Sequence, residues 1–294
     1  MVLSKLRHAN AASKLGADEK NDLATGLQAT LGASLAGLRP LNGGTLGIIF
    51  SGTLDGCERC FKTHAVPSGQ VTLRREHAFL QQISNNRTDA SLFSVAERDS
   101  QRTWLQMNLL SSCNDLTPAT IRRLVFDYEA KLPGKIGFAL VPAEDNIHLL
   151  LDKSEQSLAL LSDHDLISAG VASKARHRLT HLRAISGEFI LQLCHGDLGP
   201  ANILCDDFGP VAIDWEDAFW GIAGYDYLYW LTFFSNRRWL TPDSVGHTPW
   251  GRPAEVALMV MILLLKCMLS VRDGSYLGNK ISFDQRLMEV IALD

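Results

Sequence analysis

The chain has 294 residues, of which 46% are hydrophobic, and a formal net charge of −4. This length suits one or two domains with sizeable cores, and the small negative charge gives no electrostatic reason to expect binding to nucleic acid or to an anionic membrane. Residues 1–20 lack the apolar core of a secretory signal, and six Cys without such a signal favour a reducing compartment. We therefore expect a cytoplasmic protein with mostly buried thiols.

The N-terminal third predicts one helix followed by a small antiparallel sheet. Residues 18–31 have apolar positions at helical spacing and are followed by a glycine, and short strands are predicted at 36–41, 47–52 and 57–66. The turn at 42–45 contains Gly43 and Gly44. Glycines in a turn allow backbone N–H groups to approach phosphate oxygens, although most such turns are only turns, so both interpretations stay open.

A buried ion pair is predicted between Lys62 and Glu76. By itself, Lys62 in the third strand is either an exposed edge charge or an inward cation. In the helix predicted over 70–83, Glu76 shares its face with apolar residues at i+3, i+4 and i+7, so its carboxylate points inward. An unpaired buried charge is costly, and Lys62 is the nearest candidate partner in the sequence.

The rest of the chain is mainly helical after a last strand at 103–107. Helices are predicted at 118–132, 144–161 and 163–186, and the basic residues within 174–183 form either a solvated face or a site for an acidic substrate. The apolar run 256–269 contains Lys266. Since it is too short to cross a bilayer, it predicts a buried helix.

Asp197, Asn202 and Asp214 carry the strongest chemical signal. Short strands at 202–205 and 211–213 flank a turn at 206–209, and a hairpin of this size brings Asn202 and Asp214 to the same end. An amide oxygen and a carboxylate suit Mg²⁺, and Asp197 in a glycine-flanked loop is free to meet a hydroxyl group. The string Asp-Phe-Gly at 207–209 is the hairpin turn, so it is not a metal site.

His-Gly-Asp at 195–197, Asn202 and Ile-Asp-Trp-Glu at 213–216 together resemble the aminoglycoside phosphotransferase and choline kinase superfamily, relatives of the protein kinases. The resemblance implies that Asp197 is the catalytic Asp and that Asn202 and Asp214 bind Mg²⁺. Choline kinases usually carry Asn where this chain has Gly196, which leaves the substrate open.

The resemblance also implies the fold, an α+β two-lobe protein-kinase-like fold. We expect a small antiparallel-sheet lobe at 1–107, which binds the nucleotide, and a larger, mainly helical lobe at 108–294, which carries catalysis and substrate binding. By analogy, Lys62 positioned by Glu76 holds the α- and β-phosphates of ATP, and the backbone at Met107 binds adenine.

The four candidates for substrate binding all follow Asp214 in the sequence. Glu216 and Asp217, with the rings of Trp215 and Trp220, suit an ammonium or polyamine substrate, whereas the alternative is that the aromatic residues pack the core. Only a dozen residues separate Asp214 from Asp226, which leaves no room for a peptide-docking loop. Asp226 either braces the catalytic loop or simply caps a helix.

The sequence thus predicts an ATP- and Mg²⁺-dependent kinase that phosphorylates a hydroxyl group of a small molecule, with Asp197 as catalytic base. We expect no nucleic acid, membrane or protein substrate. The alternative is a protein that binds ATP without transferring phosphate. The absence of a Gly-x-Gly-x-x-Gly fingerprint favours this alternative. The acceptor, the preference between ATP and GTP, and the oligomeric state stay open.

Overall fold

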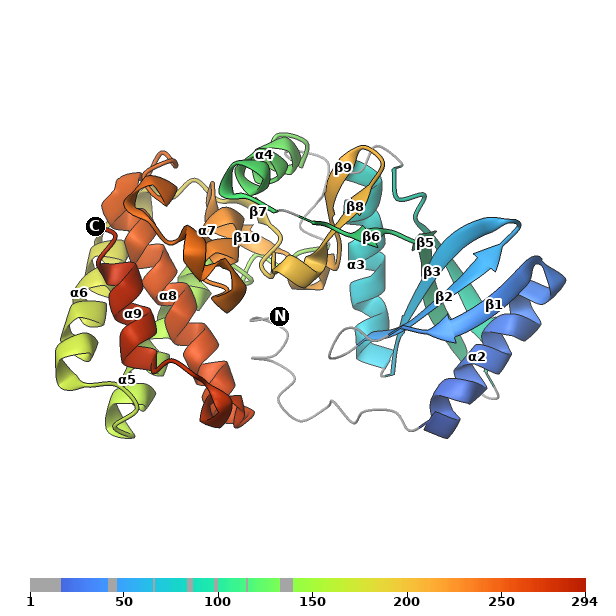
Figure 1. The fold of residues 1–294 in the computed structure, drawn as a ribbon, viewed down its shortest axis with the longest axis horizontal. Helices are drawn as coiled ribbons and strands as arrows, with labels where there is room; N and C mark the ends of the chain where they lie inside the picture. Colours follow the sequence, from blue (N-terminus) through green and yellow to red (C-terminus); the bar gives the residue numbers. More distant parts are fainter. Residues whose placement is uncertain are drawn as a thin grey trace. The chain divides into compact units, whose positions relative to one another are not determined.

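The computed structural model describes residues 17–41, 47–65, 67–83, 87–97, 100–114, 116–132 and 140–294. The chain divides into two compact units. Of the described residues, the sheet unit comprises those up to 113 together with 203–216, and the helical unit comprises 114–202 and 217–294. Figure 1 labels the helices and strands of both units.

The sheet unit is built on a five-stranded antiparallel sheet in the order β1-β2-β3-β5-β4. Helix α2 (Ala17–Leu31) precedes the sheet, and α3 (Pro67–Ile83) lies between the third and fourth strands in sequence. The strands are β1 (Leu35–Pro40), β2 (Gly47–Leu54), β3 (Cys57–His64), β4 (Ser91–Ala96) and β5 (Gln101–Asn108).

Helices α2 and α3 cover opposite faces of this sheet. Phe61 on β3 is fully buried in an apolar cluster with Leu27 of α2 and Trp104 of β5. The next residue, Lys62, contacts Glu76 of α3. Because neighbouring side chains on a strand point to opposite faces, the pleat of β3 separates an apolar face from a charged one.

A hairpin completes the sheet unit. It consists of β8 (Ile203–Asp206) and β9 (Gly209–Ala212), and β6 (Ser111–Ser112) pairs with β8. Asp207 and Phe208 form the turn, as predicted for the Asp-Phe-Gly string, and pairing of Ile203 with Ala212 closes the other end.

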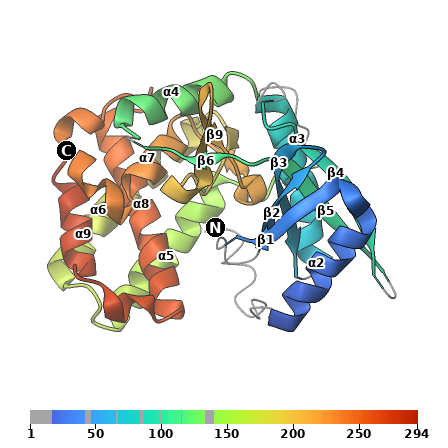
Figure 2. The same ribbon diagram turned by 45° about the vertical axis from the view of Figure 1, so that its right-hand side comes forward.

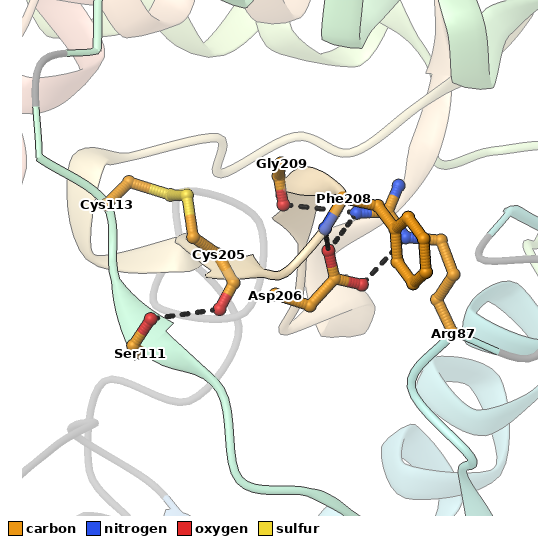
Figure 3. The surroundings of a disulfide bond; sticks show 7 residues. All are labelled: Arg87, Ser111, Cys113, Cys205, Asp206, Phe208 and Gly209. Carbon is orange, nitrogen blue, oxygen red and sulfur yellow. Dashed lines mark hydrogen bonds and ion pairs between the residues drawn. A yellow bond between two sulfur atoms is a disulfide. The ribbon is translucent and has the colours of Figure 1, made fainter.

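Two contacts tie this hairpin to the rest of its unit (Figure 3). Cys113 and Cys205 form a disulfide, and the guanidinium of Arg87 makes two bonds to the carboxylate of Asp206, one of them 2.7 Å long, while also lying over the ring of Phe208. We expected these cysteines to be free thiols, and the disulfide corrects that expectation. The sequence offered no sign of it, because these two Cys are 92 residues apart.

The helical unit is organised around α8 (Gly251–Arg272), which packs against α5, α6, α7 and α9. Figures 1 and 2 both show α8 among α5, α6 and α9. The helix is long and apolar enough to cross a membrane, but its apolar segment is 72% buried inside the protein, as expected for a core helix. The other helices are α4 (Pro118–Glu129), α5 (Ile147–Asp163), α6 (Ala169–Ile185), α7 (Tyr225–Leu231) and α9 (Phe283–Ile291), and the short strands β7 (Gln192–Cys194) and β10 (Phe219–Gly221) pair with each other.

Candidate active site

In the sheet unit, one ammonium group lies among three carboxylates. Lys62 Nζ is 2.8 Å from Glu76 Oε2, 2.6 Å from Asp214 Oδ1 and 2.7 Å from Glu216 Oε1. The side chains of Lys62 and Glu76 are 9% and 2% exposed. The predicted ion pair is therefore present, and it is buried on the face of β3 that α3 covers.

Burial and neighbouring charges shift the pKa values of this cluster in opposite directions. Burial by itself lowers the pKa of Lys62, but the surrounding carboxylates outweigh it and raise that pKa well above its usual value. Burial is also the largest influence on Glu76, and it raises the pKa of that carboxyl. For Glu216, burial is outweighed by Lys62 and by His64, whose Nε2 is 2.8 Å from Glu216 Oε1, so the pKa of Glu216 lies below its usual value.

Asp214 is held by its backbone as well as by its side chain. Strand β9 ends at Ala212, and Asp214 follows with a left-handed backbone (φ 66°), a conformation that Asp tolerates better than most residues. Its N–H donates to Glu76 Oε1 at 2.9 Å. Glu76 thus fixes both Lys62 and the turn that carries Asp214.

The donor set of this cluster suits a hard divalent cation. Ligand oxygens of Glu76, Asp214 and Glu216 all lie within 4.8 Å of one another, and they carry more negative charge than the single ammonium group balances. Carboxylate oxygens are the ligands that Mg²⁺ prefers. The residues present therefore fit the metal that the sequence predicts.

In the helical unit, three side chains surround Asp197. Tyr229 of α7 donates its hydroxyl hydrogen to Asp197 Oδ1 at 2.6 Å, and Asn202 donates through Nδ2 to the main-chain oxygen of Asp197 at 2.9 Å and to Oδ2 at 3.3 Å. The N–H of Asp197 donates to His195 Nδ1 at 3.2 Å. Because the amide nitrogen of Asn202 points to Asp197, the Oδ1 atom of Asn202 is the one that can bind a metal.

Asp226 braces the loop that carries Asp197. It is fully buried and accepts hydrogen bonds from the N–H groups of His195 (2.7 Å) and Gly196 (2.9 Å) and from the Tyr128 hydroxyl (2.6 Å). The residue that caps α7 is Gly224. Of the two roles open from the sequence, the structure therefore supports bracing.

Gly196 is required by the shape of this loop. Its φ is +83°, and a Cβ atom at this position would lie 2.2 Å from the main-chain oxygen of Asp217. An Asn at this position, as in choline kinases, therefore needs a different course of the loop.

The four substrate candidates are divided between the two units: Trp215 and Glu216 belong to the sheet unit, and Asp217 and Trp220 belong to the helical unit. Trp215 is fully buried and stacks on Phe79 with ring centroids 4.8 Å apart, so it is a core residue. Trp220 is half-buried and donates to the main-chain oxygen of Val141 at 3.1 Å, Asp217 is buried, and Glu216 contacts Lys62. The prediction of an aromatic cage that includes Trp215 is corrected, because a fully buried ring offers no surface to a ligand.

The other nucleotide candidates are only partly placed. Met107 lies on β5, is buried and pairs with Cys60 of β3. Gly43 and Gly44 lie outside the described residues.

Sequence reasoning missed His64 and Tyr229. His64 is two residues after Lys62 and therefore on the same face of β3, a period-2 signal that was available. Tyr229 lies in a stretch of aromatic residues at 225–234, where nothing distinguishes one functional hydroxyl from rings that pack the core.

Comparisons with known proteins agree with the motifs. Residues 139–251, which include the catalytic loop, the hairpin and Asp214, match the model of the phosphotransferase enzyme family. No curated protein sequence matches the chain significantly.

Solved structures resemble the chain over nearly its full length. The aminoglycoside phosphotransferase APH(4)-Ia is 15% identical with a TM-score of 0.60, and the match covers 93% of this chain and 98% of that chain. A choline/ethanolamine kinase family protein from Mesorhizobium loti is 15% identical, with a TM-score of 0.60 and coverage of 93% and 94%. Choline kinase from Cryptosporidium parvum is 10% identical, with a TM-score of 0.53 and coverage of 92% and 93%. The resemblance inferred from the motifs is confirmed: residues 139–251 match the phosphotransferase enzyme family, and the chain, over the 93% that the matches cover, has the protein-kinase-like fold of aminoglycoside phosphotransferases and choline kinases.

Proposed function

We propose that this protein is a kinase that transfers the γ-phosphate of ATP to a hydroxyl group of a small molecule. The observation that carries the proposal is the environment of Asp197, whose carboxylate is oriented by Tyr229 and Asn202 within a segment that matches a phosphotransferase family. Phosphoryl transfer needs little covalent chemistry from the protein, so oriented groups of this kind supply most of the catalysis.

The nucleotide role rests on Lys62 and on related structures. Variants of APH(4)-Ia form ternary complexes with hygromycin B and either AMP-PNP or ADP. In our proposal Lys62, fixed by Glu76, contacts the α- and β-phosphates of ATP, and the backbone at Met107 binds adenine. Gly43 and Gly44 stay candidates for binding phosphate oxygens.

We assign the Mg²⁺ ligands to Asn202 and Asp214, with Glu216 as an additional carboxylate near Asp214. Mg²⁺ held by these residues would neutralise charge on the phosphate oxygens during transfer. The contribution of this chain is the carboxylate cluster itself, which Glu76 holds in place from α3.

Asp197 acts on the acceptor. Its carboxylate orients the hydroxyl group and takes up the proton as the acceptor oxygen bonds to the γ-phosphorus and the bond from that phosphorus to the bridging oxygen of ADP breaks. Tyr229 orients Oδ1 of this carboxylate, and Asn202 orients Oδ2.

The acceptor is proposed as a class, an aminoglycoside-like, amino-alcohol or sugar-like compound. The contacts of Glu216 with Lys62 and His64 favour a role beside the nucleotide over one in binding the acceptor. Asp217 and Trp220 stay as candidates for the acceptor site. We propose a cytoplasmic enzyme without a protein, nucleic-acid or membrane substrate.

The proposal is tested by measuring ADP release from Mg·ATP with a panel of aminoglycosides, choline, ethanolamine, thiamine and sugars. Asp197→Asn serves as the blank. Turnover with one class of acceptor that is lost in the variant supports the kinase and names its substrate. If Mg·ATP raises the melting temperature but no compound supports turnover, the alternative of a protein that binds ATP without transfer is favoured.

A further inference from the structure

Lys266 is the single charged residue within the apolar core helix over 256–269, and the proposed mechanism does not use it. Its Nζ lies 3.7 Å from the ring centroid of Tyr229 and 3.6 Å from that of Phe233. It donates a hydrogen bond to Thr232 Oγ1 at 2.7 Å. An ammonium group so close to two aromatic faces makes strong cation–π contacts, which gain in strength as water is excluded.

Both rings contact the catalytic loop. The Tyr229 hydroxyl donates to Asp197 Oδ1 at 2.6 Å. The Phe233 ring packs so closely on Gly199 that a Cβ atom there would lie 2.7 Å from the ring. The two rings are also in edge-to-face contact, with centroids 5.5 Å apart. One ammonium group thus holds two rings that touch the loop on either side of Leu198.

The charge state of Lys266 follows from opposing influences. Burial is the largest influence and lowers the pKa of Lys266 well below its usual value, and the charge of Arg286 acts in the same direction, whereas the negative charge of Asp197 opposes this shift. The electron-rich faces of the two rings act in the same direction as Asp197 and favour the ammonium form. Arg286, whose Nη2 donates to the main-chain oxygen of Thr232 at 2.6 Å, is the neighbouring cation.

We propose that Lys266 is a positioning residue of the kinase: it fixes the rings of Tyr229 and Phe233 and thereby holds Asp197 in the orientation that transfer requires. A cation over the face of Tyr229 also draws electron density from the phenol, which makes its hydroxyl a stronger donor to Asp197.

The kinetic test rests on the proposed function. Lys266→Met removes the charge and the donor, Lys266→Gln keeps a donor for Thr232 Oγ1 without the charge, and Lys266→Arg keeps the charge. We expect kcat of ADP release to fall about tenfold in the Met and Gln variants with KM for Mg·ATP and for the acceptor unchanged, and to recover in part with Arg. In a Tyr229→Phe background, Lys266→Met has little further effect. A rise in the acceptor KM at constant kcat would instead make Lys266 a substrate ligand and overturn the proposal.

A second readout does not depend on turnover. The chain has five tyrosines, so in protein labelled with 3-fluorotyrosine the fluorine signal of Tyr229 is assigned by its loss in Tyr229→Phe. We expect Asp197→Asn to shift this signal in the wild type but not in Lys266→Met, whereas Arg272→Met, which removes an exposed cation at the end of α8, leaves the Asp197→Asn shift intact. An unchanged response in Lys266→Met would contradict the proposal even if no acceptor supports turnover, so failure of the kinase assignment and failure of the role of Lys266 are distinguishable.

Discussion

Asp197 makes its contacts through separate atoms: Tyr229 binds one carboxylate oxygen, while Asn202 and His195 also bind the main chain. The change Asp197→Asn therefore keeps the shape of the side chain and its main-chain contacts, and removes only the charge and the basic oxygen. We expect transfer to fall by about 10²- to 10⁴-fold, the usual range for loss of a general base, with nucleotide affinity nearly unchanged. Single-turnover kinetics with calorimetric nucleotide binding checks this, and retained turnover would exclude Asp197 as the base.

Asp214 has a different role, so we expect its loss to weaken nucleotide binding. Asp214→Ala removes a carboxylate from the cluster around Lys62, so nucleotide affinity in the presence of Mg²⁺ is expected to fall by at least about tenfold, while affinity without Mg²⁺ changes little. Asp207→Ala is the matched control, because Asp207 is an exposed carboxylate in the turn of the same hairpin. Equal affinities for the two variants in titrations with and without Mg²⁺ would exclude Asp214 as a ligand.

At the scale of elements, the hairpin of β8 and β9 depends on the Cys113–Cys205 disulfide. The bond closes a loop with a sequence separation of 92 residues, so the chain-entropy account predicts that Cys113→Ser lowers the free energy of unfolding by about 4.6 kcal/mol. Urea unfolding without reductant measures this, with Cys57→Ser, the loss of an exposed free thiol, as control. If reductant destabilises Cys113→Ser as much as the wild type, the disulfide is not the cause of the difference in stability.

The elements that the sequence predicted are those with a strong local pattern. Helices α2 and α3 were found because their apolar positions recur at helical spacing, and α8 was found because a continuous apolar run predicts a buried helix. The hairpin was found because turn residues separate two apolar runs. Strand β4 and helix α9 were missed. Strand β4 (Ser91–Ala96) has one buried residue, Val95, among exposed and half-buried ones, so its burial shows no clear alternation. It forms a hairpin with β5, the next strand in the chain.

In the candidate site, too, the sequence predicted the residues that belong to a local pattern. Residue type and spacing identified Asp197, Asn202 and Asp214, and helical periodicity identified Glu76 as the inward partner of Lys62. Contacts between residues far apart in sequence, such as Tyr229 with Asp197, follow from tertiary packing and leave no local pattern. The aromatic residues after Asp214 were ambiguous for the same reason, since a core ring and a ligand-binding ring look alike in the sequence.

At the scale of the whole molecule, stability is expected to depend on pH through Glu129. Burial raises the pKa of Glu129 from 4.5 to about 7, although the N–H of Gly224 donates to its Oε1 at 3.0 Å. The folded protein thus binds a proton that the unfolded chain has released, so between about pH 4.5 and 7 this group makes the protein less stable as pH rises. The loss amounts to about 3 kcal/mol.

The variant Glu129→Gln isolates this effect because it keeps an acceptor for Gly224 and cannot ionise. The difference in unfolding free energy between the wild type and the variant is expected to change across this pH range and to be constant above it. Urea unfolding of both proteins at a series of pH values provides the measurement, and parallel pH profiles would show that Glu129 titrates normally.

The central claim is that the chain transfers phosphate to a small molecule through Asp197. Its most direct test is mass spectrometry of the acceptor after incubation with Mg·ATP and either the wild type or Asp197→Asn, using the compound from the panel that gives the highest ADP release. The account predicts a phosphorylated acceptor with the wild type and almost none with the variant. ADP release with no phosphorylated acceptor, or equal product with both proteins, would contradict it.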